Sequence, residues 1–197
     1  AIAVARGEGV RVWDVDGNEY LDFLGGVAVD VLGHCHPALV RALEEQARTI
    51  WHVSNHFHIP RQVELAEALL AVTPFASRVF FCNSGAEANE AMLKLARKYF
   101  HDRGHPERNE IVSCVGSFHG RTLFTLTTGG QPKYQRGFEP LVPGVRHVPF
   151  GDLAALEAAL TDRTAAFIVE PIMGESGVVP APEGYLPFVS VIVPVRN

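Results

Sequence analysis

The chain has 197 residues, enough for one large domain or a small pair of domains with a substantial buried core. Hydrophobic residues make up 47% and charged residues 20%, which is typical of globular proteins and disfavours a low-complexity class. The formal net charge of −5 and the lack of a basic patch argue against nucleic acid as a main partner. No apolar run approaches the roughly 20 residues that span a bilayer, and the N-terminus lacks a secretory signal pattern, so we expect a cytoplasmic protein with no membrane partner.

The first part of the chain predicts a β-hairpin and two helices. Apolar and polar residues alternate over 10–15 and 20–23, and Asp16-Gly17 between them is a pair typical of tight hairpin turns. Apolar residues then recur at helical spacing in two stretches before Pro74. The predicted helices cover residues 37–50 and 62–71.

From residue 78 onward strands and helices alternate, which predicts an α/β fold with a wound, mostly parallel sheet and helices on both faces. Residues 167–169 are continuously apolar, as expected for a strand that is covered on both faces. The predicted strands cover 78–82, 110–115, 145–148 and 165–170, and the predicted helices cover 85–99 and 153–160.

The cysteines and histidines predict neither a disulfide nor a metal site. The three cysteines are an odd number at wide separations, so we expect buried free thiols rather than a disulfide or a reactive nucleophile. Five histidines lie between residues 34 and 58, but no cysteine or carboxylate pattern near them has the spacing of a zinc site. We therefore expect no metal and assign these histidines to pocket walls or a subunit interface. The residues concerned are Cys35, Cys82 and Cys114, and His34, His36, His52, His56 and His58.

The turn between the predicted strand at 78–82 and the helix after it is the segment that predicts chemistry. The N–H groups at a helix start have no intrahelical partners and carry partial positive charge, so a dianionic phosphate can bind there. Ser84 adds a hydroxyl donor, and Gly85 allows close approach of the backbone. By itself, a Ser-Gly pair before a helix is more often a plain cap than a ligand site.

Four segments resemble motifs of one enzyme family. Residues 83–91 (NSGAEANEA) resemble the cofactor-phosphate loop of the class-III (ornithine-type) aminotransferases, which use pyridoxal 5′-phosphate. Three further segments match motifs of this family in the same order along the chain. They are an N-terminal signature at 25–37, a ring-stacking and carboxylate-binding segment at 117–122, and an acidic segment at 169–178.

The resemblance covers roughly residues 5 to 187 and implies a fold type I pyridoxal-phosphate-dependent transferase that is truncated in this chain. It assigns 1–60 to the small domain, 61–187 to the first part of the large cofactor-binding domain and 188–197 to a divergent tail. That tail does not fit the amphipathic helix with which the family continues, because it has alternating valines and Pro194. A truncation or a change of reading frame near Pro187 is the simplest interpretation.

The same resemblance implies which residues hold the cofactor. Phe118 would stack on the pyridine ring, where a flat apolar face excludes water. Glu170 ends an apolar strand and would support the ring, while His119 fits either packing behind the site or a direct contact. The residues assigned to the phosphate are Ser84, Gly85 and Ala86.

Two further residues are assigned to the substrate. Arg121 would bind the α-carboxylate, because a planar guanidinium can pair with both carboxylate oxygens. Glu175 would pair with an arginine of the family's C-terminal part, which this chain does not contain. The substrates implied are amino acids and 2-oxo acids.

The implied activity is transfer of an amino group from N-acetylornithine, or a related ω-amino donor, to 2-oxoglutarate by a homodimer. No catalytic residue is assigned, because the lysine that attaches the cofactor and the aspartate that binds the pyridinium belong to sequence beyond the acidic segment. The lysines present are Lys94, Lys98 and Lys133. Two alternatives follow: the N-terminal portion of an aminotransferase, inactive alone, or a catalytically silent relative that weakly binds pyridoxal phosphate or a protein partner.

Overall fold

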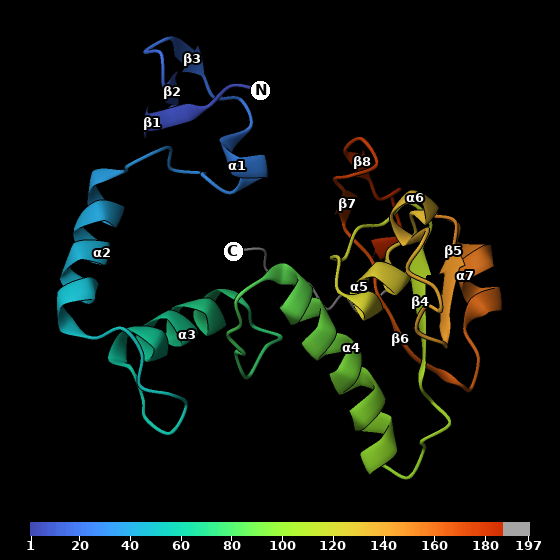
Figure 1. The fold of residues 1–197 in the computed structure, drawn as a ribbon. Coiled ribbons are helices and arrows are strands. Elements are labelled where there is room, and N and C mark those ends of the chain that lie inside the picture. Colours follow the sequence, from blue (N-terminus) through green and yellow to red (C-terminus); the bar gives the residue numbers. More distant parts are fainter. Residues whose placement is uncertain (187–197) are drawn as a thin grey trace. The chain divides into compact units, whose positions relative to one another are not determined.

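A computed structural model of the chain describes residues 1–186 (Figure 1). The predicted divergent tail at 188–197 lies outside the described residues. The chain divides into two compact units, Ala1–Val79 and a second unit from Phe80 onward. The predicted boundary near residue 60 concerns the domains of the complete fold and stays a prediction. No helix in the described part of the chain is long and apolar enough to cross a membrane.

The first unit begins with a three-stranded antiparallel sheet in the order β1-β2-β3. Its strands are β1 (Val4–Glu8), β2 (Arg11–Asp14) and β3 (Glu19–Leu21). The predicted hairpin is confirmed, and the Asp14 carboxylate closes its turn by accepting the N–H groups of Asp16 and Asn18. Strand β1 was not predicted, since Arg6-Gly7 interrupts any apolar alternation. The Arg6 guanidinium lies 3.5 Å from the centre of the Trp13 ring across the strand pair.

Three helices complete the first unit: α1 (Gly25–Ala28), α2 (Pro37–Thr49) and α3 (Pro60–Val72). The predictions over 37–50 and 62–71 are therefore confirmed. Each of the two longer helices begins with proline, whose fixed φ and missing N–H suit the first helical position. The loop before α2 is tied to the sheet, because His34 and Gly9 exchange backbone hydrogen bonds of 2.8 and 2.9 Å.

The second unit is built around a parallel sheet in the order β5-β4-β6. Its strands are β4 (Glu110–Cys114), β5 (Val145–Val148) and β6 (Thr164–Phe167), followed by the antiparallel pair β7 (Ile172–Met173) and β8 (Val179–Pro180). Its helices are α4 (Gly85–Asp102), α5 (Leu123–Thr128), α6 (Pro132–Gln135) and α7 (Leu153–Ala159).

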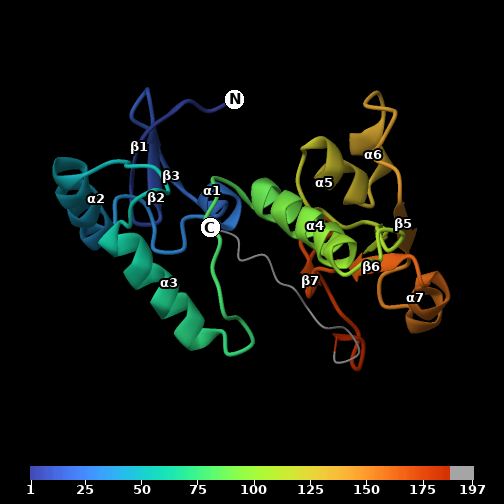
Figure 2. The ribbon, with the colours of Figure 1, turned by 90° about the horizontal axis from the view of Figure 1, so that it is seen from below.

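Helices cover both faces of this sheet, as predicted (Figures 1 and 2). Ile111 of β4 packs in a cluster with Leu93 of α4 and Phe124 of α5. The next residue, Val112, belongs to a second cluster that contains Leu156 of α7. Because successive strand residues point to opposite faces, this single pair of neighbours shows the two-sided burial of β4.

Two predicted strands differ from the structure. Residues 78–82 do not form a strand, since no strand of the described chain pairs with them, and Phe80 is 71% exposed. The prediction over 165–170 is also too long, because β6 ends at Phe167. An apolar run becomes a strand only where a neighbour completes the hydrogen-bond ladder, and sequence periodicity does not report on that neighbour.

Candidate functional site

The start of α4 is a capped helix end with two unused backbone donors. Ser84 is the N-cap, and its Oγ accepts the N–H of Glu87 at 3.2 Å. No described residue accepts a hydrogen bond from the N–H of Gly85 or Ala86. A Cβ at Gly85 would meet no atom within 4 Å, so open space lies in front of it. This end of α4 therefore fits a phosphate group, as the sequence predicts.

The segment 117–122 is fastened to the first two turns of α4. A Cβ at Gly120, which has φ +129°, would approach the Cβ of Ala86 to 2.8 Å, so the two backbones are in close contact. Asn89 donates from Nδ2 to the carbonyl of His119 at 2.7 Å. Ala86 and Asn89 are three residues apart and therefore lie on one face of the helix. The phosphate loop and the ring-stacking segment are thus brought together.

A further hydrogen bond joins α4 to the segment 117–122, and it was not predicted from the sequence. Thr122 donates from Oγ1 to the carboxylate of Glu90 at 2.5 Å. Glu90 follows Asn89 on the same side of α4, and Asn89 is buried, with 6% of its surface exposed. Nothing in the sequence pattern pointed to this contact, because Glu90 and Thr122 are 32 residues apart in the chain.

The acidic segment at 169–178 also contacts the backbone of residues 116–118. Glu170 accepts the backbone N–H of Phe118 at 2.8 Å, and Ser176 donates from Oγ to the carbonyl of Gly116 at 2.6 Å. Glu175 is exposed and forms no ion pair among residues 1–186, so its role stays a prediction. Three of the four motif segments, from widely separated parts of the sequence, therefore meet in the second unit.

Arg121 lies beside two aromatic rings. Its guanidinium carbon is 4.2 Å from the centre of the Tyr134 ring and 5.9 Å from that of Phe118. The two rings meet edge to face with centres 6.3 Å apart. Arg121 is exposed and has no acidic partner in the described part of the chain. Tyr134 was missed by sequence reasoning, because a tyrosine after Pro132 carries no spacing signal.

His119 is buried, with 4% of its surface exposed, and lies within a hydroxyl network. Its Nε2 is 3.2 Å from the Ser113 Oγ, which in turn is 3.2 Å from the Ser117 Oγ. The hydroxyl of Ser117 also accepts the N–H of Gly130 at 3.2 Å. Through its Nε2, His119 ties the segment 117–122 to Ser113 of β4. A direct role of His119 toward the cofactor stays a prediction.

The three cysteines are free, but they differ in environment. Cys114 is buried as expected, and burial raises the pKa of its thiol to about 11. Cys35 is exposed, which corrects the prediction of burial, because it occupies a turn at φ +53° two residues after Gly33. Cys82 is partly buried.

The described histidines, cysteines and acidic residues form no group of three that could hold a metal ion. His34 instead lies between two carboxylates of the first unit, with its Nε2 2.7 Å from Asp22 and its Nδ1 3.3 Å from Asp30. The hydrogen bond from His34 and two backbone N–H groups lower the pKa of Asp22. This cluster holds the loop of the N-terminal signature.

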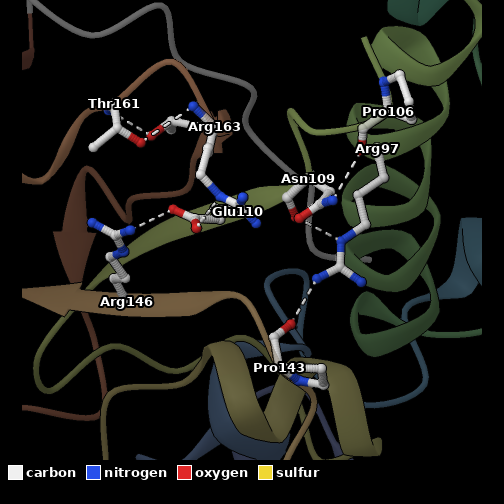
Figure 3. A network of polar contacts seen from close by, with 9 residues as sticks. Arg97, Pro106, Asn109, Glu110, Pro143, Arg146, Thr161 and Arg163 are labelled. Carbon is white, nitrogen blue, oxygen red and sulfur yellow. Dashed lines mark hydrogen bonds and ion pairs between the residues drawn. The ribbon is translucent and has the colours of Figure 1, made fainter.

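An arginine network closes the opposite end of the parallel sheet (Figure 3). Glu110, the first residue of β4, is held by Arg146 at 2.7 Å and by Arg163 at 2.8 Å. Arg97 donates to the carbonyls of Asn109 and Pro143 at 2.9 and 3.0 Å. The candidate site follows the carboxyl end of β4 instead, which is where open parallel sheets place their ligands.

Comparisons with known proteins agree with this geometry. The sequence matches the family model described as aminotransferase class-III over residues 1–194. The acetylornithine aminotransferase of Pseudomonas putida is 59% identical over 186 residues, which are 94% of this chain and 46% of the relative. The succinylornithine transaminase of Salmonella typhimurium is 55% identical over 181 residues, with 92% and 44% covered. The chain thus spans somewhat under half the length of these curated relatives.

Solved structures show the same fold. An ornithine aminotransferase from Toxoplasma gondii has a TM-score of 0.88 at 36% identity, with 94% of this chain and 44% of that one covered, and its description records pyridoxal phosphate at the active site. The N-acetylornithine aminotransferase from Stenotrophomonas maltophilia has a TM-score of 0.80 at 41% identity, with 94% and 46% covered.

Proposed function

The chain belongs to the class-III aminotransferase family, whose members depend on pyridoxal 5′-phosphate, and on this premise we propose that it forms the side of an aminotransferase site that binds phosphate, ring and carboxylate. The proposed reaction moves an amino group from N-acetylornithine, or a related ω-amino donor, to 2-oxoglutarate. Relatives named for acetylornithine and succinylornithine support this donor class. The full reaction, in a cytoplasmic homodimer, is proposed for the full-length protein.

The observation that carries the proposal is the convergence of three segments beyond the carboxyl end of β4. The hydroxyl of Ser84 and the N–H groups of Gly85 and Ala86 would hold the phosphate. Phe118 would cover one face of the ring, with its backbone N–H held by Glu170 at 2.8 Å. When bound, the cofactor supplies an electron sink for negative charge at the carbon that bears the amino group.

Arg121 would bind and orient the carboxylate of the donor. Its ring contact with Tyr134 leaves guanidinium N–H groups for two parallel hydrogen bonds to a carboxylate. Fixing the carboxylate fixes the distance of the donor from the ring that Phe118 covers, and such orientation lowers the entropy cost of reaction.

The lysines support the second candidate, a chain that binds pyridoxal phosphate without turnover. Lys98 is engaged with Asp102 on the outer face of α4, and Lys94 is exposed on the same helix. Lys133 lies with its Nζ 4.6 Å from the centre of the Tyr134 ring. None of the three matches the family's lysine segment in sequence.

A chimera separates the two candidates. Residues 1–186 are joined to the part of the Pseudomonas putida acetylornithine aminotransferase that follows its matched segment, and glutamate formation is measured with N-acetylornithine, N-succinylornithine, ornithine and 4-aminobutyrate. We expect turnover with N-acetylornithine in the chimera and none in the 197-residue chain. A folded chimera that forms no glutamate from any donor, while the Pseudomonas enzyme does, would contradict the aminotransferase proposal.

A further inference from the structure

Glu87 is part of the phosphate loop, although the resemblance assigns it no role. Its Oε2 accepts the backbone N–H of Asn83 at 2.7 Å, and its Oε1 accepts the side-chain N–H of the same residue at 3.2 Å. Its own backbone N–H donates to the Ser84 Oγ at 3.2 Å. Glu87 therefore fixes the two residues that lead into the helix, in a variant of the capping box.

The hydroxyl proton of Ser84 has two possible acceptors once a phosphate is bound. One lone pair of Oγ is used by the N–H of Glu87, so the O–H remains to be donated. The Glu87 Oε2 lies 3.4 Å from that Oγ, which is long for a hydrogen bond between oxygens. A phosphate oxygen in front of Ser84 can therefore take this proton, in competition with the carboxylate.

The charge of Glu87 acts against the same ligand. No lysine, arginine or histidine in the described part of the chain forms an ion pair with Glu87. Its negative charge is offset by the two N–H groups of Asn83 and by the helix start, and the helix start is also what attracts the phosphate. Like charges a few ångströms apart near the surface repel each other, and salt weakens that repulsion.

We propose that Glu87 is a positioning residue that shapes the phosphate loop through its hydrogen bonds while its charge lowers the affinity of the loop for phosphate. The inference rests on the proposed phosphate site at Ser84, Gly85 and Ala86. The loop therefore binds a phosphate less tightly than its hydrogen-bond geometry allows. As a result, the phosphate end of the cofactor dissociates more easily.

The test uses the 197-residue chain and two ligands that differ only in the phosphate, pyridoxine 5′-phosphate and pyridoxine. Neither carries an aldehyde, so reaction with Lys94, Lys98 or Lys133 does not interfere. Dissociation constants are measured by equilibrium dialysis for the wild type, Glu87→Gln and Glu87→Ala. Glu157→Gln is the matched control, because it removes one carboxylate from α7, away from the loop. Circular dichroism checks that every variant is folded.

Glutamine keeps a carbonyl acceptor for the Asn83 N–H but loses the charge, so Glu87→Gln should bind pyridoxine 5′-phosphate about three- to tenfold tighter at low salt. The gain should shrink as salt is raised, a response that a purely structural role would not produce. Glu87→Ala should bind at least about threefold more weakly than Glu87→Gln, because the Asn83 N–H loses its acceptor. Pyridoxine binding should not change in any variant.

Each contrary result has a definite meaning. An unchanged affinity in Glu87→Gln, or an equal gain in Glu157→Gln, overturns the charge effect of Glu87. Equal affinities of Glu87→Ala and Glu87→Gln overturn its positioning role. If the wild type binds pyridoxine 5′-phosphate no better than pyridoxine, both this inference and the proposed phosphate site are wrong, whereas a clear phosphate preference without the Glu87→Gln gain leaves that site standing.

Discussion

The guanidinium of Arg121 packs on an aromatic ring and forms no ion pair in the described part of the chain. The ring of Tyr134 supports its guanidinium, and no carboxylate of the described chain pairs with it. Arg103 provides an informative comparison, because its guanidinium lies 4.1 Å from the centre of the Tyr99 ring but at the far end of α4. The two arginines share the same support and differ in location, so only Arg121 is expected to act on substrate.

We predict that Arg121→Ala in the chimera lowers kcat/KM for N-acetylornithine by roughly 30- to 160-fold, which corresponds to about 2–3 kcal/mol for a lost bidentate contact. Arg103→Ala should leave kcat/KM within about twofold of the parent chimera. Steady-state kinetics with both variants decide this. An unchanged kcat/KM in Arg121→Ala would remove the carboxylate-binding assignment.

The buried thiol of Cys114 makes the free energy of unfolding depend on pH in the alkaline range. Burial raises the pKa of its thiol from about 9 to about 11 in the folded chain. As pH rises, the unfolded chain therefore loses this proton first, and the contribution of Cys114, complete below about pH 9, is lost as pH approaches about 11. Cys114→Val keeps an apolar side chain of similar size and removes the titration.

In urea unfolding at pH 8 to 11, the free energy of unfolding should fall less steeply with pH in Cys114→Val than in the wild type. The Tyr185 hydroxyl contacts the Cys114 sulfur, and burial together with Cys114 raises the pKa of Tyr185, so the difference between the two proteins reports on the Cys114–Tyr185 pair. Parallel curves for the two proteins would show that the Cys114–Tyr185 pair does not titrate differently on unfolding.

At the scale of elements, the seam between α4 and the segment 117–122 depends on Gly120. This residue has φ +129°, and an added Cβ would lie 2.7 Å from the Thr125 Oγ1, 2.8 Å from the Ala86 Cβ and 3.0 Å from the Ala86 Cα. Gly137 also has a positive φ, +89°, but an added Cβ there would meet nothing within 4 Å. Comparing the two separates backbone strain from steric contact.

Gly137→Ala should destabilise the chain by about 1–2 kcal/mol, from the left-handed backbone alone. Gly120→Ala should cost about 2–4 kcal/mol, because the Cβ must also displace the Thr125 hydroxyl and the first turn of α4. It should also weaken pyridoxine 5′-phosphate binding, which Gly137→Ala should not. Chemical denaturation and dialysis provide both measurements, and equal effects of the two substitutions would argue against close contact at the seam.

Elements with a strong local period were predictable from the sequence, and those defined by their neighbours were not. The helix α2 has a proline start and apolar residues at helical spacing, so its bounds were predicted within one residue. Helix α5 has the sequence LFTLTT, in which Thr127 and Thr128 donate to carbonyls four residues earlier. Threonines in that number favour strands in isolation, and only burial in the second unit makes them helical.

The same division holds for the site. The cap at Ser84 and the exposed Arg121 could be expected from short motifs, because a cap and a charge depend on nearby residues. Asn89 and Tyr134 could not, since each acts through a contact with a segment at least 13 residues away in sequence, such as the 2.7 Å bond from Asn89 to His119. Long-range contacts of this kind leave no period in the sequence.

At the scale of the whole molecule, burial is concentrated in the second unit. Every buried side chain of the described residues lies at Asn89 or beyond. The first unit exposes large apolar side chains, with Phe23 at 92% and Trp51 at 84%. An element that buries little surface opens at little cost in free energy. The first unit is therefore expected to be the less stable of the two.

Limited proteolysis should reflect this difference. At low protease concentration, cleavage should begin before Phe80, and a fragment that starts near that residue should persist. Mass spectrometry of the products over time identifies the sites. Early cleavage within α4 or the parallel sheet, with the first 79 residues intact, would contradict the assignment of stability to the second unit.

A nuclear magnetic resonance titration of the ¹⁵N-labelled chain with pyridoxine 5′-phosphate observes the proposed phosphate site at single backbone amides. We predict that the amide signals of Gly85 and Ala86 move and saturate, because their N–H groups donate to the phosphate, and that pyridoxine without phosphate leaves them in place. The Gly137 amide, which already donates to the Glu139 carboxylate at 2.8 Å, should not move with either ligand. Unmoved Gly85 and Ala86 signals at saturating ligand, with shifts elsewhere in the chain, would contradict a phosphate site at the start of α4.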